Sequence, residues 1–130
     1  MTDTLRKGRC LCGAVEFETR GAPRFISNCH CESCRRAASA SSVAWAGFAD
    51  ADVTFSGAAP AIYASSPGVE RSFCPRCGST LAYRGERWKG ETHLPVCAFE
   101  NASELAPQSD FYVEEMLPWA KRLGATDGNA

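Results

Sequence analysis

Three cysteines lie within six positions of one short segment, residues 28–34, which reads Asn-Cys-His-Cys-Glu-Ser-Cys. The spacing Cys-x-Cys-x-x-Cys brings three thiols within reach of one metal ion, and thiolates are strong ligands for zinc. A structural zinc has four protein ligands, whereas a catalytic zinc has three and keeps a position for water or substrate. The segment therefore predicts a zinc site. Its three thiols, Cys29, Cys31 and Cys34, are called the three-cysteine cluster below.

Two other turns, residues 10–13 and 74–78, each carry two cysteines followed by a glycine. Each turn has the chemistry of a zinc knuckle, because two thiolates share one tight turn and the glycine can adopt a positive φ. That φ directs backbone amides toward the sulfurs. Two knuckles from distant parts of a chain complete a four-thiolate site, which adds free energy of folding to a small domain. We predict a structural zinc on the four-cysteine cluster, which is Cys10, Cys12, Cys74 and Cys77.

The fourth ligand of the three-cysteine cluster is left open by the residues alone. Cys97 could complete the site, or His30, Glu32 or His93 could, or the position could belong to water or substrate. Thiols buried without a metal are disfavoured by the regular spacing. Cys97 lies in an apolar segment and is expected to be a packed core thiol. His30 is expected to support a ligand or lie on the surface, and His93 to be hydrogen-bonded rather than metal-bound.

Length and composition predict a single zinc-binding domain over residues 1–130. The net charge of −1 disfavours bulk electrostatic binding to nucleic acid or to an anionic membrane. No apolar run has the length of a membrane span, and residues 1–9 are polar, unlike a signal peptide. We therefore expect a cytoplasmic protein, in which eight cysteines serve as metal ligands or reactive thiols. Four disulfides or an iron–sulfur cluster are the less favoured uses of these cysteines.

Short alternating segments predict a mainly β fold of small sheets with one short helix at residues 33–40. Residues 84–92 are charged and are predicted to form an exposed loop, and Pro95 favours an edge strand. Trp45, Phe48 and Trp119 are assigned to the core. The predicted strands are residues 14–19, 24–28, 42–48, 52–57, 61–64, 69–73, 79–83, 93–99 and 111–115.

Three motifs in this order resemble the glutathione-dependent formaldehyde-activating enzyme family, to which centromere protein V is also similar. They are Cys-Leu-Cys-Gly-Ala-Val at 10–15, Cys-His-Cys-x-x-Cys-Arg at 29–35 and Arg-x-Phe-Cys-Pro-x-Cys-Gly-Ser at 71–79. The resemblance covers roughly residues 7–120 and implies a zinc-stapled β-tent of antiparallel sheets. It implies two zinc ions per chain, a structural one on the four-cysteine cluster and a catalytic one, with an exchangeable position, on the three-cysteine cluster.

The resemblance also implies an activity. The family's name refers to the condensation of glutathione with formaldehyde to S-hydroxymethylglutathione, which is classed as a carbon–sulfur lyase reaction. A small thiol such as glutathione and a small aldehyde are the implied partners. Residues 38–40 and 98–101 depart from the pattern often seen in the family, and these departures concern the substrate rather than the metals. The rival function is a zinc-stabilised binding module without catalysis.

Arginines beside the cysteine motifs are candidates for contacts to the substrate. Glutathione carries carboxylates, which guanidinium groups bind well. Arg35 and Arg36 directly follow the three-cysteine cluster, and Arg71 precedes the second knuckle. We expect Arg35 and Arg36 to bind the thiol substrate, although a solvated surface position suits arginine equally well.

Overall fold

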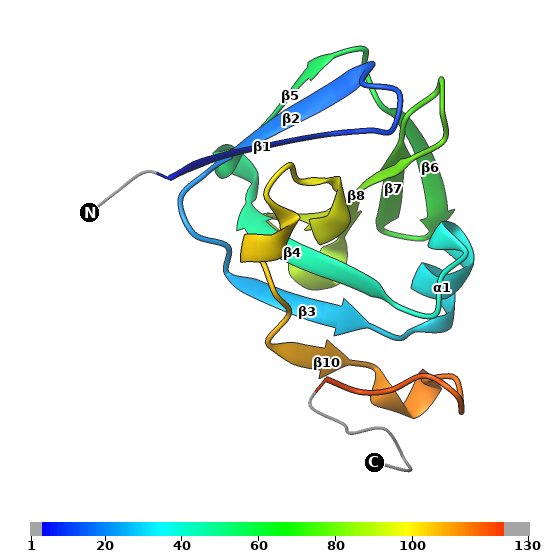
Figure 1. Ribbon diagram of the computed structural model, residues 1–130. Coiled ribbons are helices and arrows are strands. Elements are labelled where there is room, and N and C mark those ends of the chain that lie inside the picture. Colours follow the sequence, from blue (N-terminus) through cyan, green and yellow to red (C-terminus); the bar gives the residue numbers. More distant parts are fainter. Residues whose placement is uncertain (1–3, 124–130) are drawn as a thin grey trace.

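The computed structural model describes residues 4–123 and is built mostly from short strands in two sheets (Figure 1). The three-stranded sheet has the order β1-β2-β5 and the seven-stranded sheet the order β10-β3-β4-β9-β8-β7-β6. All neighbours are antiparallel except β10, which runs parallel to β3. In the described part, α1 (Glu32–Ala38) is the one α-helix. The mainly β class with one short helix is confirmed.

The strands and 3-10 turns follow one another through short connections. The first five strands are β1 (Leu5–Arg9), β2 (Val15–Arg20), β3 (Phe25–Cys29), β4 (Val43–Ala49) and β5 (Val53–Gly57). The last five are β6 (Ala61–Ser66), β7 (Val69–Phe73), β8 (Thr80–Gly85), β9 (Glu91–Pro95) and β10 (Ser109–Phe111). The 3-10 turns are η1 (Asp50–Asp52), η2 (Glu86–Trp88), η3 (Val96–Ala98), η4 (Ala102–Glu104) and η5 (Val113–Glu115).

The core lies between the two sheets and follows from the alternation of the strands. In β2, which is the middle strand of the small sheet, Val15, Phe17 and Thr19 are buried and the residues between them are not. The ring of Phe17 packs edge-on against Phe99, with ring centroids 5.0 Å apart. A side chain at Gly8 would overlap the Phe17 ring, so this position on β1 accepts only glycine. Phe99 also packs against Phe48 of β4, with ring centroids 6.0 Å apart, so it connects the small sheet to the large one.

Three predictions about the chain around Cys97 are wrong. The strand predicted at residues 93–99 runs from Glu91 to Pro95, and the chain then turns into η3. Cys97 is exposed on that turn rather than packed in the core. Because β9 lies between β4 and β8, it is a central strand and not an edge. Pro95 is tolerated there because it is the last residue of β9, where the hydrogen-bond ladder ends.

Other element boundaries also differ from the prediction. Strand β1 was not predicted, since residues 5–9 are polar; it forms because it pairs along its whole length with β2. The predicted strand at 111–115 is β10 followed by η5. Phe48 and Trp45 are buried as expected, but Trp119 is 70% exposed, in the turns that follow η5. No helix within residues 4–123 is both long and apolar enough to cross a membrane.

Candidate metal and substrate site

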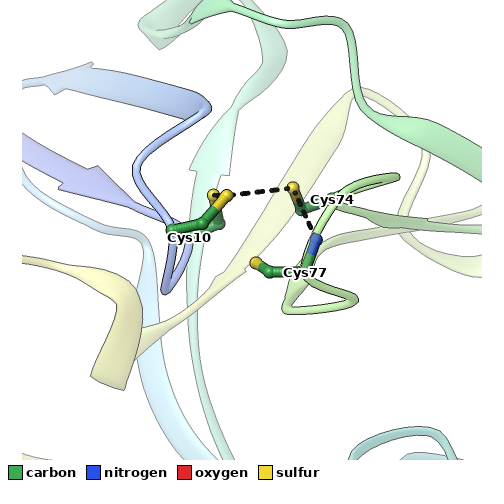
Figure 2. A group of neighbouring side chains, drawn as sticks. Cys10, Cys74 and Cys77 are labelled. Atoms are coloured by element: carbon green, nitrogen blue, oxygen red, sulfur yellow. Dashed lines mark hydrogen bonds between the residues drawn. The ribbon is translucent and has the colours of Figure 1, made fainter.

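The four-cysteine cluster joins two turns that are distant in sequence. The turn that carries Cys10 and Cys12 connects β1 to β2, and the turn that carries Cys74 and Cys77 connects β7 to β8. Figure 2 shows the sulfurs of Cys10, Cys74 and Cys77 gathered between these turns. All four Sγ atoms lie within 4.8 Å of one another. The two knuckles predicted from the sequence therefore meet in space.

The backbone of both turns is shaped around the sulfurs. Gly13 and Gly78 have φ values of +82° and +81°, which side-chain-bearing residues rarely adopt. The amides of Arg76 and Cys77 donate to Cys74 Sγ at 3.3 and 3.4 Å. A hydrogen bond between Cys77 and the Ser79 hydroxyl lowers the pKa of Cys77 to about 5.

The sulfur separations fit a zinc ion. Zinc binds thiolate sulfur at about 2.3 Å, so the sulfurs of a tetrahedral site are about 3.8 Å apart. The Sγ atoms of Cys10 and Cys12 are 3.7 Å apart, and those of Cys12 and Cys74 are 3.9 Å apart. This cluster can hold a metal ion with four ligands from the chain.

The three-cysteine cluster is assembled locally, at the junction between β3 and α1. Cys29 is the last residue of β3, Cys31 caps the N-terminus of α1, and Cys34 is buried within the helix. The amide of Cys34 donates to Cys31 Sγ at 3.3 Å. The three Sγ atoms lie within 4.8 Å of one another, and among residues 4–123 no fourth cysteine, histidine or carboxylate joins them at that distance.

The residues considered as a fourth ligand have other surroundings. Cys97 lines a shallow hollow beside Cys10, on the side of the four-cysteine cluster. His30 is buried, and its Nε2 lies 2.8 Å from Asp110 Oδ1. The surface position is therefore wrong, and the support of a metal ligand by His30 stays a prediction. His93 Nε2 lies 2.9 Å from Glu91 Oε1, so the predicted hydrogen-bonded histidine is confirmed as well.

Arg71 on β7 brings a positive charge to the three-cysteine cluster. Its Nη1 and Nη2 atoms each lie 3.8 Å from Cys34 Sγ, and its guanidinium group stands 5.1 Å from the centroid of the Tyr83 ring. Hydrogen bonds from Cys29 and Cys31, with Arg71 adding to them, lower the pKa of Cys34 to about 2. The same hydrogen bonds raise the pKa of Cys29. Cys34 therefore loses its proton more readily than Cys29.

Arg35 and Arg36 lie farther from the sulfurs than their sequence position suggests. Arg35 donates to the backbone oxygens of His30 and Glu115, at 3.2 and 3.3 Å. Arg36 forms an exposed ion pair of 2.7 Å with Glu32. Neither lines the cavity at the cluster, although Arg36 lines a shallower hollow that shares Arg71 with it.

A cavity of about 310 Å³ opens directly on the three-cysteine cluster. Its lining includes the cysteines, Arg71, His93 and several aromatic rings that come from many different elements. The aromatic residues are Phe25, Trp45, Tyr83, Trp88, Phe111 and Tyr112.

The sequence analysis missed most of this lining, because it placed Trp88 in an exposed charged loop and Phe111 in a strand without a role. One signal was present. Trp88 is the only large apolar residue among residues 84–92, and burial of such a ring is favourable, so a tryptophan in a charged segment indicates that other groups cover it. The positions of the other rings depend on the pairing of β3, β8 and β10 within one sheet and carry no mark in the local sequence.

Comparisons with known proteins agree with the motifs. The model of the glutathione-dependent formaldehyde-activating enzyme family matches residues 5–115. A Halomonas elongata protein, whose name assigns it provisionally to these enzymes, is 36% identical over 123 residues, 88% of this chain and 78% of its own length. An uncharacterized lyase of Schizosaccharomyces pombe is 35% identical over 109 residues, covering 84% of this chain and 79% of its own length. A crystal structure of a Rhodobacter sphaeroides protein superposes with a TM-score of 0.63 and 25% identity, over 73% of this chain and 88% of that one.

Proposed function

Because the chain belongs to the glutathione-dependent formaldehyde-activating enzyme family, we propose that it adds a small thiol such as glutathione to a small aldehyde. The reaction class is that of a carbon–sulfur lyase, and it runs in both directions. The observation that carries the proposal is the three-cysteine cluster, whose sulfurs lie beside a cation and open on a cavity. Membership of an enzyme family also favours catalysis over the rival function of a binding module.

We assign two zinc ions to the chain. Cys10, Cys12, Cys74 and Cys77 would hold the structural ion with four ligands, and Cys29, Cys31 and Cys34 would hold the second. When bound at the second site, zinc would supply one exchangeable coordination position and lower the pKa of a thiol that takes it. We place the protein in the cytoplasm, because seven ligand thiols must stay reduced.

The reaction conserves atoms and electrons without an oxidant or reductant. The substrate sulfur gives up its proton and forms a bond to the aldehyde carbon, while the π bond of the carbonyl breaks. The carbonyl oxygen takes the electron pair and then a proton, which yields a hemithioacetal, the S-(1-hydroxyalkyl) derivative of the thiol. No covalent bond to the chain is required.

In this scheme the residues of the chain bind and orient the two substrates and exclude water from them. Arg71 lies at hydrogen-bond distance from Cys34 Sγ, so it can stabilise negative charge that is shared among the sulfurs. The rings of the cavity keep water away from the reacting carbonyl, which strengthens electrostatic interactions there. We assign the carboxylates of the thiol substrate to the shallower hollow, where Arg36 and Arg71 supply guanidinium groups.

Zinc stoichiometry tests the assignment of the metals. Elemental analysis is expected to find two zinc ions per wild-type chain and one in Cys31→Ser, with the circular dichroism spectrum unchanged. The exposed Cys97 provides a matched control, since Cys97→Ser should retain both ions. A single zinc in the wild type, or an unfolded Cys31→Ser protein, would contradict the division.

Activity is tested separately. The zinc-loaded protein should accelerate the consumption of formaldehyde by glutathione above the spontaneous rate, and Cys31→Ser should not. If the wild type gives no acceleration with any aldehyde, the proposed reaction is wrong, even if the zinc count is correct.

A further inference from the structure

We propose that the aldehyde taken by this site carries an aromatic ring, and that the cavity beside the three-cysteine cluster is the pocket for that ring. The inference rests on the proposed function and names its substrate class. It depends on three properties of the cavity, which are its size, its walls and its charge.

The cavity is too large for the smallest aldehyde. Formaldehyde has two heavy atoms and is comparable to a water molecule, which occupies about 30 Å³ of liquid volume. An apolar cavity of about 150 Å³ holds one benzene molecule. The cavity here measures about 310 Å³, which accommodates an aromatic ring together with its carbonyl and the sulfur that attacks it. An aldehyde without a substituent would leave most of this space to water.

One part of the wall is aromatic and begins beside the sulfurs, whereas Ser33, Ser65 and Ser66 line another part. Phe25, Tyr83 and Phe111 pack against the buried group that contains Cys29 and Cys34. Trp88 extends the surface away from the cluster. Its ring is stacked on Phe111 at 5.9 Å and an interplanar angle of 16°, and its centroid lies 5.6 Å from that of Phe25. A planar ring inserted here would meet offset and edge-on partners at the distances that aromatic pairs prefer.

Each of these rings keeps an exposed part. Phe25, Tyr83, Trp88, Phe111 and Tyr112 bury most of their surface, but none of them is fully buried. They come from β3, β8, η2, β10 and the residue after β10, and all of them line the same cavity. Apolar surface gathered in a concave site is covered most favourably by an apolar ligand.

The charges of the cavity favour an uncharged ring over the charged body of the thiol substrate. Arg71 is the one lysine or arginine in its lining, and its guanidinium group is directed at Cys34 and Tyr83. Glu115 also lines the cavity and supplies a negative charge there. Arg87 lies outside it, hydrogen-bonded to the Tyr112 hydroxyl and placed over that ring. Among residues 4–123 no second arginine or lysine lines the cavity, whereas the neighbouring hollow, to which we assigned the two carboxylates of a glutathione-like thiol, adds Arg36 to Arg71.

Binding of two stable adduct mimics tests the pocket without catalysis. Isothermal titration of the zinc-loaded chain with S-benzylglutathione and S-methylglutathione should give a Kd at least tenfold lower for the benzyl compound. Trp88→Ala should reduce this ratio at least threefold, and Trp88→Phe should retain most of it. Trp119→Ala is the matched control, because Trp119 is exposed and does not line the cavity. A general loss of structure would weaken both ligands without changing their ratio. Wild-type Kd values within twofold of each other would overturn the proposal.

Rates with two aldehydes separate this inference from the proposed function. With glutathione, kcat/KM for benzaldehyde is expected to exceed that for formaldehyde at least tenfold, measured above the spontaneous reaction. A preference for formaldehyde overturns the aromatic assignment and leaves the proposed function in place. Acceleration of neither aldehyde overturns both the function and the aldehyde class.

Discussion

The two cysteine clusters use the same ligand chemistry in opposite ways. The four-cysteine cluster draws its sulfurs from two turns more than 60 residues apart, as the contact between Cys12 and Cys74 shows. The three-cysteine cluster takes all its sulfurs from the junction of β3 and α1. The first closes a long loop of the chain, whereas the second closes almost none.

The number of cysteines in a cluster, and their separation along the sequence, therefore distinguish a cluster that stabilises the fold from one that can take part in a reaction. A site that ties distant segments together removes much entropy from the unfolded chain, so its loss is expected to unfold a domain of this size. A local site with three ligands adds little to the fold. Six aromatic residues line the cavity at the three-cysteine cluster, and Arg71 contacts one of its sulfurs. The hollow beside the four-cysteine cluster has one aromatic residue, Phe99, and its arginine, Arg9, donates to backbone oxygens.

The largest effect is expected from Cys74→Ser. Cys74 is buried and receives two amide hydrogen bonds, and its loss would leave three ligands on two turns that nothing else joins as strongly. Zinc contributes on the order of 10 kcal/mol to small metal-stabilised folds, comparable to the whole stability of a domain. The variant should lack a cooperative thermal transition by circular dichroism. A folded Cys74→Ser protein with a Tm near that of the wild type would contradict the structural role of the four-cysteine cluster.

Cys34→Ser should separate activity from folding. The substitution removes one ligand of the three-cysteine cluster and the partner of Arg71, but it leaves both knuckles intact. We expect the activity to fall by more than the roughly 100-fold that follows the loss of a residue supporting a metal ligand. The protein should remain folded and keep one zinc ion. Steady-state kinetics with elemental analysis would check this, and a collapse of the fold similar to that of Cys74→Ser would contradict it.

Arg71→Gln is expected to have an intermediate effect. It removes the cation beside Cys34 without removing a ligand, so the zinc content should stay at two. A loss of about 10- to 100-fold in kcat/KM is expected, typical of residues that support a metal ligand. Arg71→Lys should recover part of it, because the charge is kept but the two-pronged contact is not. Arg76→Gln, in the exposed part of the second knuckle, is the control and should leave kcat/KM unchanged.

The smallest expected effect is on the stability of the fold at low pH, through the pair of Glu91 and His93. Burial raises the pKa of Glu91, but hydrogen bonds from His93 and Arg24 outweigh it, so the pKa lies below its usual value in the folded protein. A lowered carboxyl pKa stabilises the fold above the unfolded pKa, near 4.3, and this stabilisation is lost as the pH falls through the folded pKa.

Glu91→Gln removes this titration. The wild type should therefore lose about 1 kcal/mol more stability than Glu91→Gln when the pH falls from 6 to 3. Urea unfolding at each pH measures the difference, and zinc release in acid affects both proteins alike. Glu16→Gln, on the outer face of β2, is the control and should follow the wild type. Identical pH profiles for wild type and Glu91→Gln would contradict the assigned role of the His93 and Arg24 contacts.

Much of the fold and of the cysteine chemistry could be predicted from the sequence, because both depend on local patterns. Alternation located the eight strands from β2 to β9 to within a few residues, and the Cys-x-Cys-Gly and Cys-x-x-Cys-Gly turns indicated knuckles before their glycines were seen at positive φ. Predictions failed where the surroundings of a segment, rather than its own residues, determine its structure or its burial. Strand β1 is polar and exists because β2 offers it a partner. Cys97, flanked by apolar residues, is exposed because the chain turns directly after Pro95.

Ligand type and spacing are local properties of a segment, so the sequence alone predicts which residues can carry metal chemistry and how the cysteines divide. What surrounds each cluster depends on the tertiary structure. The four-cysteine cluster needs β1–β2 and β7–β8 to be brought together, and the cavity needs rings from strands that pair across the large sheet. Distances between segments far apart in the chain depend on how the sheets pair and pack, and no short stretch of sequence encodes them.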